Sequence, residues 1–178
     1  MKKIHLTIIL FLAYGMVSAQ ESSKEAIGKL SFLVGNWEGE AKAATGPGEI
    51  QLINQHESVA DKLGGRMLMI EGKGYQNGDL VFNAIGLVTF DEGNQKYEMQ
   101  SWLATGETTK AYFEERGDKK FEWGFPLPNG QVRYLISLDE EGRWKEKGEF
   151  SPDGNTWYPS FEMLLTKKQT NESGKALG

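Results

Sequence analysis

The chain has 178 residues, among them no cysteine, two histidines and five prolines. The lack of cysteine excludes a disulfide framework, a thiol nucleophile, an iron–sulfur cluster and a thiolate zinc site. Basic residues are not in excess, since 20 Lys and Arg stand against 25 Asp and Glu. Nucleic acid and anionic membrane surfaces attract basic proteins, so this balance argues against both as partners. The composition, 39% hydrophobic and 25% charged, is typical of a globular protein rather than a disordered chain.

The only long hydrophobic run lies near the N-terminus. Two lysines precede the apolar segment from Leu6 to Val17, and Val17-Ser18-Ala19 has small residues at the spacing that signal peptidases accept. We therefore expect residues 1–19 to be a signal peptide. The apolar segment is shorter than the roughly 20 residues of a membrane anchor, and Gln20 stands where a lipoprotein has a cysteine. The expected product is exported, periplasmic or extracellular, and neither lipid-anchored nor membrane-spanning.

The remaining sequence predicts one domain, residues 20–168, followed by a polar, disordered tail, residues 169–178. A domain of this size buries about 70% of the surface of its unfolded chain, which is enough for one core. A short helix is expected at its start, because Ser22 and Glu25 fit a capping box. Apolar residues then recur at helical spacing: Ala26, Ile27, Leu30 and Leu33.

After this helix, short runs of β-forming residues alternate with turn sequences rich in Gly, Asn and Asp. They predict ten strands, at about 35–44, 49–60, 66–76, 80–90, 95–104, 108–116, 119–125, 131–139, 143–150 and 156–166. No connection is long enough for a helical crossover, so the strands must be antiparallel neighbours. The predicted fold class is therefore all-β, an up-and-down meander that closes into a barrel and so removes its two exposed edges. A two-sheet sandwich is the alternative.

The strand predicted at 80–90 is apolar on both sides. Phe82, Val88 and Phe90 lie on one side, while Ile85 and Leu87 lie on the other. We expect this strand to be covered on both faces, by the barrel interior and by the opening helix or a neighbouring molecule.

The opening Phe32-Leu33-Val34-Gly35-Asn36-Trp37 resembles the start of calycin-type barrels, in which a short helix leads into a Gly-x-Trp first strand. With Leu63-Gly64-Gly65-Arg66, Ser101-Trp102 and Phe161-Glu162-Met163, the chain resembles the DUF1579 family of exported bacterial proteins over roughly residues 30–168. The resemblance implies a lipocalin-like barrel and no agreed activity. It also implies a structural role at one barrel end for Gly35, Trp37 and Arg66, the arginine pairing with a carboxylate or stacking on the Trp37 indole.

The same opening is similar, more distantly, to the nitrobindin-like haem proteins, which hold haem iron through a histidine near the C-terminus. This chain has no histidine after His56. Haem binding is therefore not expected, and neither is another cofactor. A metal site is not expected either, because a single histidine would have to recruit carboxylates from distant strands.

Six residues are candidates for ligand contacts: Asn54, His56, Arg66, Trp102, Trp123 and Tyr134. Asn54 and His56 share one phase of their strand and would form a polar strip if that phase faced inward; otherwise His56 is a surface histidine. Arg66 offers bidentate contacts to a carboxylate or phosphate. The three aromatic residues either fill the interior or line a cavity for an apolar or planar molecule.

The sequence contains no Gly-x-Ser-x-Gly elbow, phosphate-binding loop or His-Glu-x-x-His helix, so no catalytic residue is assigned and an enzyme is the least favoured class. The preferred hypothesis is a barrel that binds a hydrophobic or amphipathic small molecule in its interior. The alternative is a non-enzymatic structural or interaction protein of the cell envelope, with a solid barrel and an exposed apolar face that forms a homodimer.

Overall fold

The structure, a computed structural model, describes residues 20–46 and 48–169. The predicted signal peptide, residues 1–19, and residues 170–178 of the predicted tail lie outside the described residues. The described chain opens with helix α1 (Ser23–Gly28) and a 3-10 turn η1 (Ser31–Leu33). Ten strands follow: β1 (Gly35–Gly46), β2 (Glu49–Lys62), β3 (Met67–Gln76), β4 (Asp79–Asp91), β5 (Lys96–Leu103), β6 (Thr108–Gly117), β7 (Lys120–Leu127), β8 (Gly130–Leu138), β9 (Trp144–Ser151) and β10 (Tyr158–Lys167).

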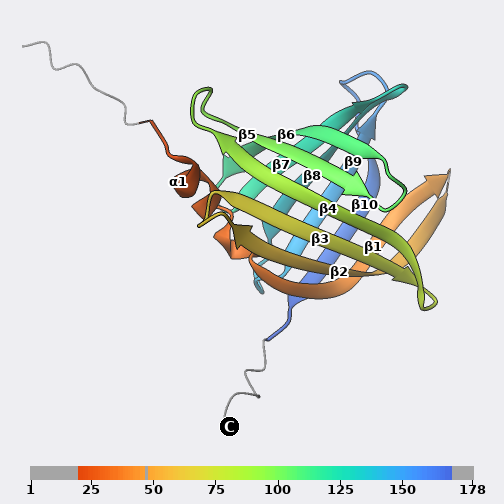
Figure 1. Cartoon of the computed structure of the whole chain (residues 1–178). Helices are drawn as coiled ribbons and strands as arrows, with labels where there is room; N and C mark the ends of the chain where they lie inside the picture. Colours follow the sequence, from red (N-terminus) through yellow and green to blue (C-terminus); the bar gives the residue numbers. More distant parts are fainter. Residues whose placement is uncertain (1–19, 47, 170–178) are drawn as a thin grey trace, which may run out of the picture.

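The ten strands form one closed antiparallel barrel, as Figure 1 shows. Each strand pairs with its neighbours along the chain, and β1 closes the ring by pairing with β10, from Trp37 opposite Lys167 to Ala43 opposite Phe161. The predicted meander is confirmed, and the sandwich alternative is excluded. The ends of the observed strands differ from the predicted ones by no more than two residues.

The tight turns follow the local chemistry of the sequence. Between β3 and β4, Asn77 and Gly78 both have positive φ angles, 54° and 91°, and Gln76 pairs with Asp79 across them. An Asn-Gly pair suits this turn because both residues tolerate the left-handed conformation that matches the twist of a hairpin. Such local turns explain why the strand boundaries could be predicted.

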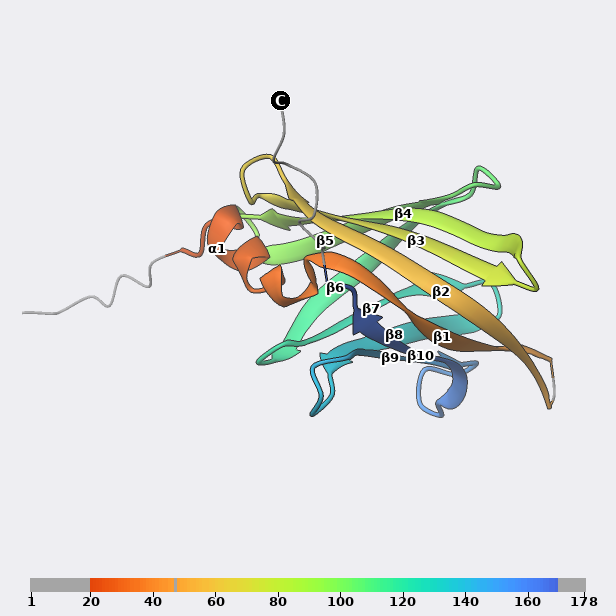
Figure 2. The ribbon, with the colours of Figure 1, turned by 90° about the horizontal axis from the view of Figure 1, so that it is seen from below.

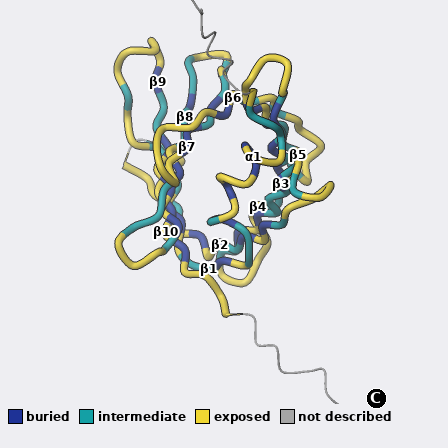
Figure 3. Tube along the Cα trace, turned by 90° about the vertical axis from the view of Figure 1, so that its left-hand side faces the viewer, coloured by how far each residue is buried: buried dark blue, intermediate teal, exposed yellow. Residues whose placement is uncertain are grey.

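Helix α1 lies across one end of the barrel, within the mouth outlined by the strands (Figures 2 and 3). The predicted capping box is present, with mutual hydrogen bonds between Ser22 and Glu25. Ala26 and Ile27 of the helix are buried. Among the described residues, no helix is long and apolar enough to cross a membrane.

Two buried hydrogen bonds attach this end piece to the barrel wall. The Tyr97 hydroxyl on β5 donates to the Ala26 carbonyl at 2.8 Å, and the Trp37 indole Nε1 on β1 donates to the Leu33 carbonyl at 2.7 Å. Below them, the rings of Tyr97, Phe113 and Phe121 pack with centroids 5.4 to 5.7 Å apart. The end of the barrel at α1 is therefore closed by apolar and aromatic side chains.

Strand β4 is covered differently from the prediction for 80–90. Val88 and Phe90 are buried on the inner face, as expected. On the outer face Ile85 is 39% exposed and Leu87 is half-buried. The described chain thus covers the inner face of β4 at Val88 and Phe90 but leaves Phe82, on the same face, 39% exposed. The outer face stays partly exposed because α1 lies at the mouth of the barrel and not against its outer wall (Figure 3).

We expect Tyr97→Phe to lower the free energy of unfolding by about 1 kcal/mol, because the substitution removes a buried hydrogen bond to the Ala26 carbonyl, which keeps only the Lys29 N–H as its donor. Urea denaturation measures the change. The control is Tyr158→Phe, because Tyr158 is 54% exposed. This substitution should change the free energy of unfolding by less than about 0.5 kcal/mol. Equal losses in the two variants would contradict the role given to the Tyr97 hydroxyl.

Candidate functional site

The strand register determines which side chains face the barrel interior. On β2 the buried phase contains Ile53, Gln55, Glu57 and Val59. The Gln55 amide and the Glu57 carboxyl therefore point into the barrel. Both faces of β2 carry polar as well as apolar residues, so the sequence alone does not show which face is turned inward. A second carboxyl, Glu146, enters from β9, where it follows the buried Trp144 on the same face.

The two interior carboxyls are almost fully buried, Glu57 with 9% and Glu146 with 6% exposure. Gln55 Nε2 donates a hydrogen bond to Glu57 Oε1 at 2.7 Å, and Trp123 Nε1 on β7 donates to Glu146 Oε1 at 3.0 Å. None of the ion pairs within residues 20–46 and 48–169 includes either carboxyl. Both acids are thus buried without a cationic partner from the described chain.

This burial raises both pKa values. Loss of hydration raises the pKa of Glu57 to about 8, and the charge of Glu146 raises it further, against the lowering effect of the Gln55 hydrogen bond. Loss of hydration also raises the pKa of Glu146, and the Trp123 hydrogen bond lowers it by a smaller amount. The resulting pKa of Glu146 is about 7. Near neutral pH the interior therefore holds carboxylic acids that are protonated for much of the time. Buried acids with such shifts are a common mark of functional sites.

Glycines on β3 make room for the polar side chains. A Cβ atom on Gly72 would lie 2.8 Å from Glu57 Oε1, and one on Gly74 would lie 2.9 Å from Gln55 Oε1. Gly72 pairs with Glu57, and Gly74 pairs with Gln55. Glycine inside a strand weakens it but allows a neighbouring group to approach closely. Because these two glycines have no side chain, Glu57 can lie against Gly72 and Gln55 against Gly74.

An aromatic group lies beside the polar side chains, toward the end of the barrel opposite α1. Trp123 and Tyr134 stack with centroids 4.2 Å apart and planes 13° apart, and Phe161 meets Tyr134 edge-on at 5.9 Å. A Cβ atom on Gly148 would lie 2.7 Å from both Tyr134 Cε1 and Phe161 Cβ. The three rings are half-buried. Along the barrel axis, the interior thus begins at α1 with a closed core of aromatic rings. The two acids come next, and the half-buried rings of Trp123, Tyr134 and Phe161 follow them.

One buried indole donor lies in this region. Trp144 is 2% exposed, and within residues 20–46 and 48–169 no atom lies in hydrogen-bonding geometry with its Nε1. The same N–H lies near enough to Glu146 to lower the pKa of that carboxyl. The Trp144 N–H and the Glu146 carboxyl together make this buried part of the interior polar.

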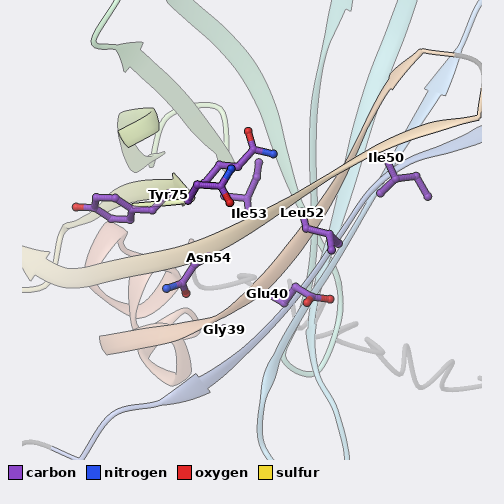
Figure 4. A pocket seen from close by; sticks show the side chains of 9 residues that line it. Gly39, Glu40, Ile50, Leu52, Ile53, Asn54 and Tyr75 are labelled. Atoms are coloured by element: carbon purple, nitrogen blue, oxygen red, sulfur yellow. The ribbon is translucent and has the colours of Figure 1, made fainter. Parts of the chain in front are cut away.

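The structure separates the six predicted ligand residues. Trp123 and Tyr134 meet in the interior. Asn54 and His56 belong to the outward phase of β2, where the His56 ring meets the Tyr75 ring at 5.4 Å. They line an open surface pocket of about 480 Å³. A neighbouring open pocket of about 610 Å³ also includes Asn54 and Tyr75, together with Leu52 and Glu40 (Figure 4).

Trp102 and Arg66 lie elsewhere. Trp102 is on the outer face of β5, opposite Ile85, and is 37% exposed. Arg66 is an exposed residue immediately before β3. The cation over Trp37 is Lys167, whose Nζ lies 5.1 Å from the ring centroid. Lys167 reaches this place because β10 pairs with β1 at Trp37.

Gly35 and Trp37 lie at the end of the barrel that α1 closes. Gly35 has a φ angle of 132°, and a Cβ atom there would lie 2.6 Å from Lys167 Cε. Glycine therefore allows the Lys167 side chain to pass along the barrel end and over the Trp37 ring.

The interior residues Gln55, Glu57 and Glu146 are absent from the candidates predicted from sequence. A charged residue in an alternating strand is usually assigned to the solvent side, because an unpaired buried charge is costly. The signal for Glu57 is that it shares its phase with Ile53 and Val59, opposite a strand that carries Gly72 and Gly74. Among the described residues, no group of three or more His, Asp or Glu is placed to hold a metal ion.

This geometry defines the chain as a small closed antiparallel β-barrel protein, with one end sealed by a helix and acids in the interior. It belongs to the family described as "Protein of unknown function (DUF1579)", whose model matches residues 25–120. The family resemblance found in the sequence is confirmed. A comparison with curated proteins finds no match.

Among solved structures, the chain is similar to "Crystal Structure of Rv2717c from M. tuberculosis". The TM-score is 0.58 at 13% sequence identity, and the match covers 81% of this chain and 98% of the other. At this identity the similarity shows a shared barrel fold.

The two acids predict an unusual pH dependence of stability. Because their folded pKa values lie above the ordinary value of 4.5, the folded state holds protons that the unfolded state has lost. The free energy of unfolding should therefore fall as the pH rises from about 5 to about 8, by up to about 1.4 kcal/mol per pH unit for each acid. Urea denaturation across this range measures the slope, and Glu57→Gln with Glu146→Gln should flatten it. An unchanged slope in the double variant would contradict the burial of the acids.

Proposed function

We propose that this protein binds a hydrophobic or amphipathic small molecule inside the barrel, entering from the end opposite α1. The observation that carries this proposal is the inner face itself, where half-buried rings of Trp123, Tyr134 and Phe161 lie beside two buried acids. Ligand sites typically combine apolar and aromatic walls with a few polar groups that orient the ligand. The other end is closed by α1 and its aromatic neighbours.

The size of the ring and its small residues favour space for a ligand. Barrels of about eight strands are just wide enough for side chains or one small ligand, and this barrel has ten strands. Several half-buried inward positions carry only a methyl group: Ala43, Ala84 and Ala111. Such an inner face favours a binding barrel over a solid one.

The proposal includes export. The sequence of residues 1–19 has the charge, apolar run and small residues of a signal peptide. The protein would then meet its ligand outside the cytoplasm.

Binding is tested with 1-aminoanthracene, a planar, neutral fluorescent probe, titrated into the native protein. We expect saturable enhancement of probe fluorescence together with a change in tryptophan emission, because Trp123 lies beside the proposed site. Ser101→Phe, which adds a ring to the inner face of β5, should weaken binding about tenfold or more.

The matched control is Gln100→Phe, which adds the same ring to the outer face at the next position. It should leave probe binding unchanged. Enhancement that does not saturate, or that Gln100→Phe reduces as much as Ser101→Phe, would overturn interior binding.

The alternative, an interaction protein, is favoured by one observation. Ile85 and Trp102 are direct partners on the outer wall and are 39% and 37% exposed, and Tyr112 on β6 is 39% exposed. If this patch forms a homodimer, sedimentation velocity should show a concentration-dependent dimer that Trp102→Glu abolishes. A monomer at all concentrations would exclude this alternative.

A further inference from the structure

We infer that the polar group recognised inside the barrel is a protonated amine, so that the ligand is an amphipathic organic cation whose nitrogen is held at the interior acids Glu57 and Glu146. This inference rests on the proposed interior binding and adds the chemical class of the ligand. It follows from three features of the interior: unused acceptors, half-buried aromatic faces and a buried donor beside Glu146.

The first feature is the unused acceptor capacity of the two acids. Within the described chain each carboxyl receives a single side-chain hydrogen bond, Glu57 from Gln55 and Glu146 from Trp123. An ionised carboxylate has about four acceptor positions. An ammonium group provides up to three donors and a positive charge, and both would favour ionisation of the acids that surround it. A ligand carboxylate would instead add a third acid to the same place.

The second feature is the set of aromatic faces next to the acids. The indole of Trp123 is hydrogen-bonded to Glu146 through Nε1 and stacks on Tyr134. Its position therefore connects the aromatic group directly to one acid. Aromatic faces attract organic cations, and tryptophan is the strongest of the three rings. A cationic head group and an apolar tail would both find partners along this path.

The third feature is the buried Nε1 of Trp144. Trp144 is nearly completely buried and precedes Glu146 on the same face of β9. The Trp144 N–H lies beside Glu146, whose pKa it lowers, and among the described residues no atom lies in hydrogen-bonding geometry with it. It therefore adds a donor next to one of the two acids. An oxygen atom of the ligand, or of a water bound with it, would accept this hydrogen bond.

Few groups around the acids titrate near neutral pH. Glu57 faces Gln55 on its own strand, Trp37 on β1 and Gly72 on β3. Glu146 faces Trp144 on its own strand, Trp123 on β7, Ile136 and Tyr134 on β8 and Met163 on β10. Burial raises the pKa of Tyr134 to about 12. Between about pH 6 and pH 8 the two acids are therefore the groups whose ionisation a bound cation would change.

The test uses three probes with the same chain length, namely decylamine, decanol and decanoate, each competing with 1-aminoanthracene for the native protein. Decylamine should displace the probe at about tenfold lower concentration than decanol, because a hydrogen bond between two charged groups is stronger than one to a neutral alcohol. Decanoate should be the weakest, because the two acids disfavour a third carboxylate beside them. Glu57→Gln with Glu146→Gln should remove the preference for the amine. The control is Glu122→Gln, which changes a buried glutamate on the outer face of β7 that binds Arg116 and Tyr112.

A second measurement keeps the test independent of whether the double variant folds. In the wild-type protein the affinity for decylamine should increase about tenfold or more between about pH 6 and pH 8, since the acids must lose protons to hold the cation, whereas that for decanol should not. Equal affinity for amine and alcohol, with no pH dependence, would overturn the inference and leave interior binding intact. Failure of 1-aminoanthracene and all three decyl probes to bind would overturn both.

Discussion

The pairing of β1 with β10 is the interaction on which the rest of the structure depends. It joins the first strand of the meander to the last, with seven residue pairs in register from Trp37–Lys167 to Ala43–Phe161. Without this closure the sheet would have two open edges and no interior. With it, Glu57 on β2 and Glu146 on β9 both point into the barrel, separated along the ring by β1 and β10.

The enclosed space is organised along the barrel axis. At the α1 end the hydrogen bonds of Tyr97 and Trp37 hold the end piece over a core of aromatic rings. The acids follow, and the rings of Trp123 and Tyr134 lie beyond them. Burying two acids costs stability whether they are ionised or neutral, since a neutral acid is still a polar group that has left water. The fold carries this cost at the acids and packs the α1 end tightly, an arrangement that suits the interior binding proposed above.

The sequence predicts the architecture well because its evidence is local. Turn pairs such as Asn77-Gly78 and the capping box of Ser22 and Glu25 depend on residues a few positions apart, and both are present in the structure. The interior depends on register between distant strands, and a shift by one residue reverses every inward assignment. Hence Trp123 and Tyr134 could be proposed from their residue types, whereas the inward phase of β2, with Gln55 and Glu57, required the structure. The position of Lys167 over Trp37 likewise depends on closure, which places β10 beside β1.

The most direct test of this account is to follow the side-chain carboxyl carbons of Glu57 and Glu146 by NMR as a function of pH, in the protein with and without decylamine. The account predicts midpoints near neutral pH without the amine, close to about 8 and about 7, and a clear fall of both when the amine is bound. Midpoints near the ordinary value of 4.5, unchanged by the amine, would contradict it.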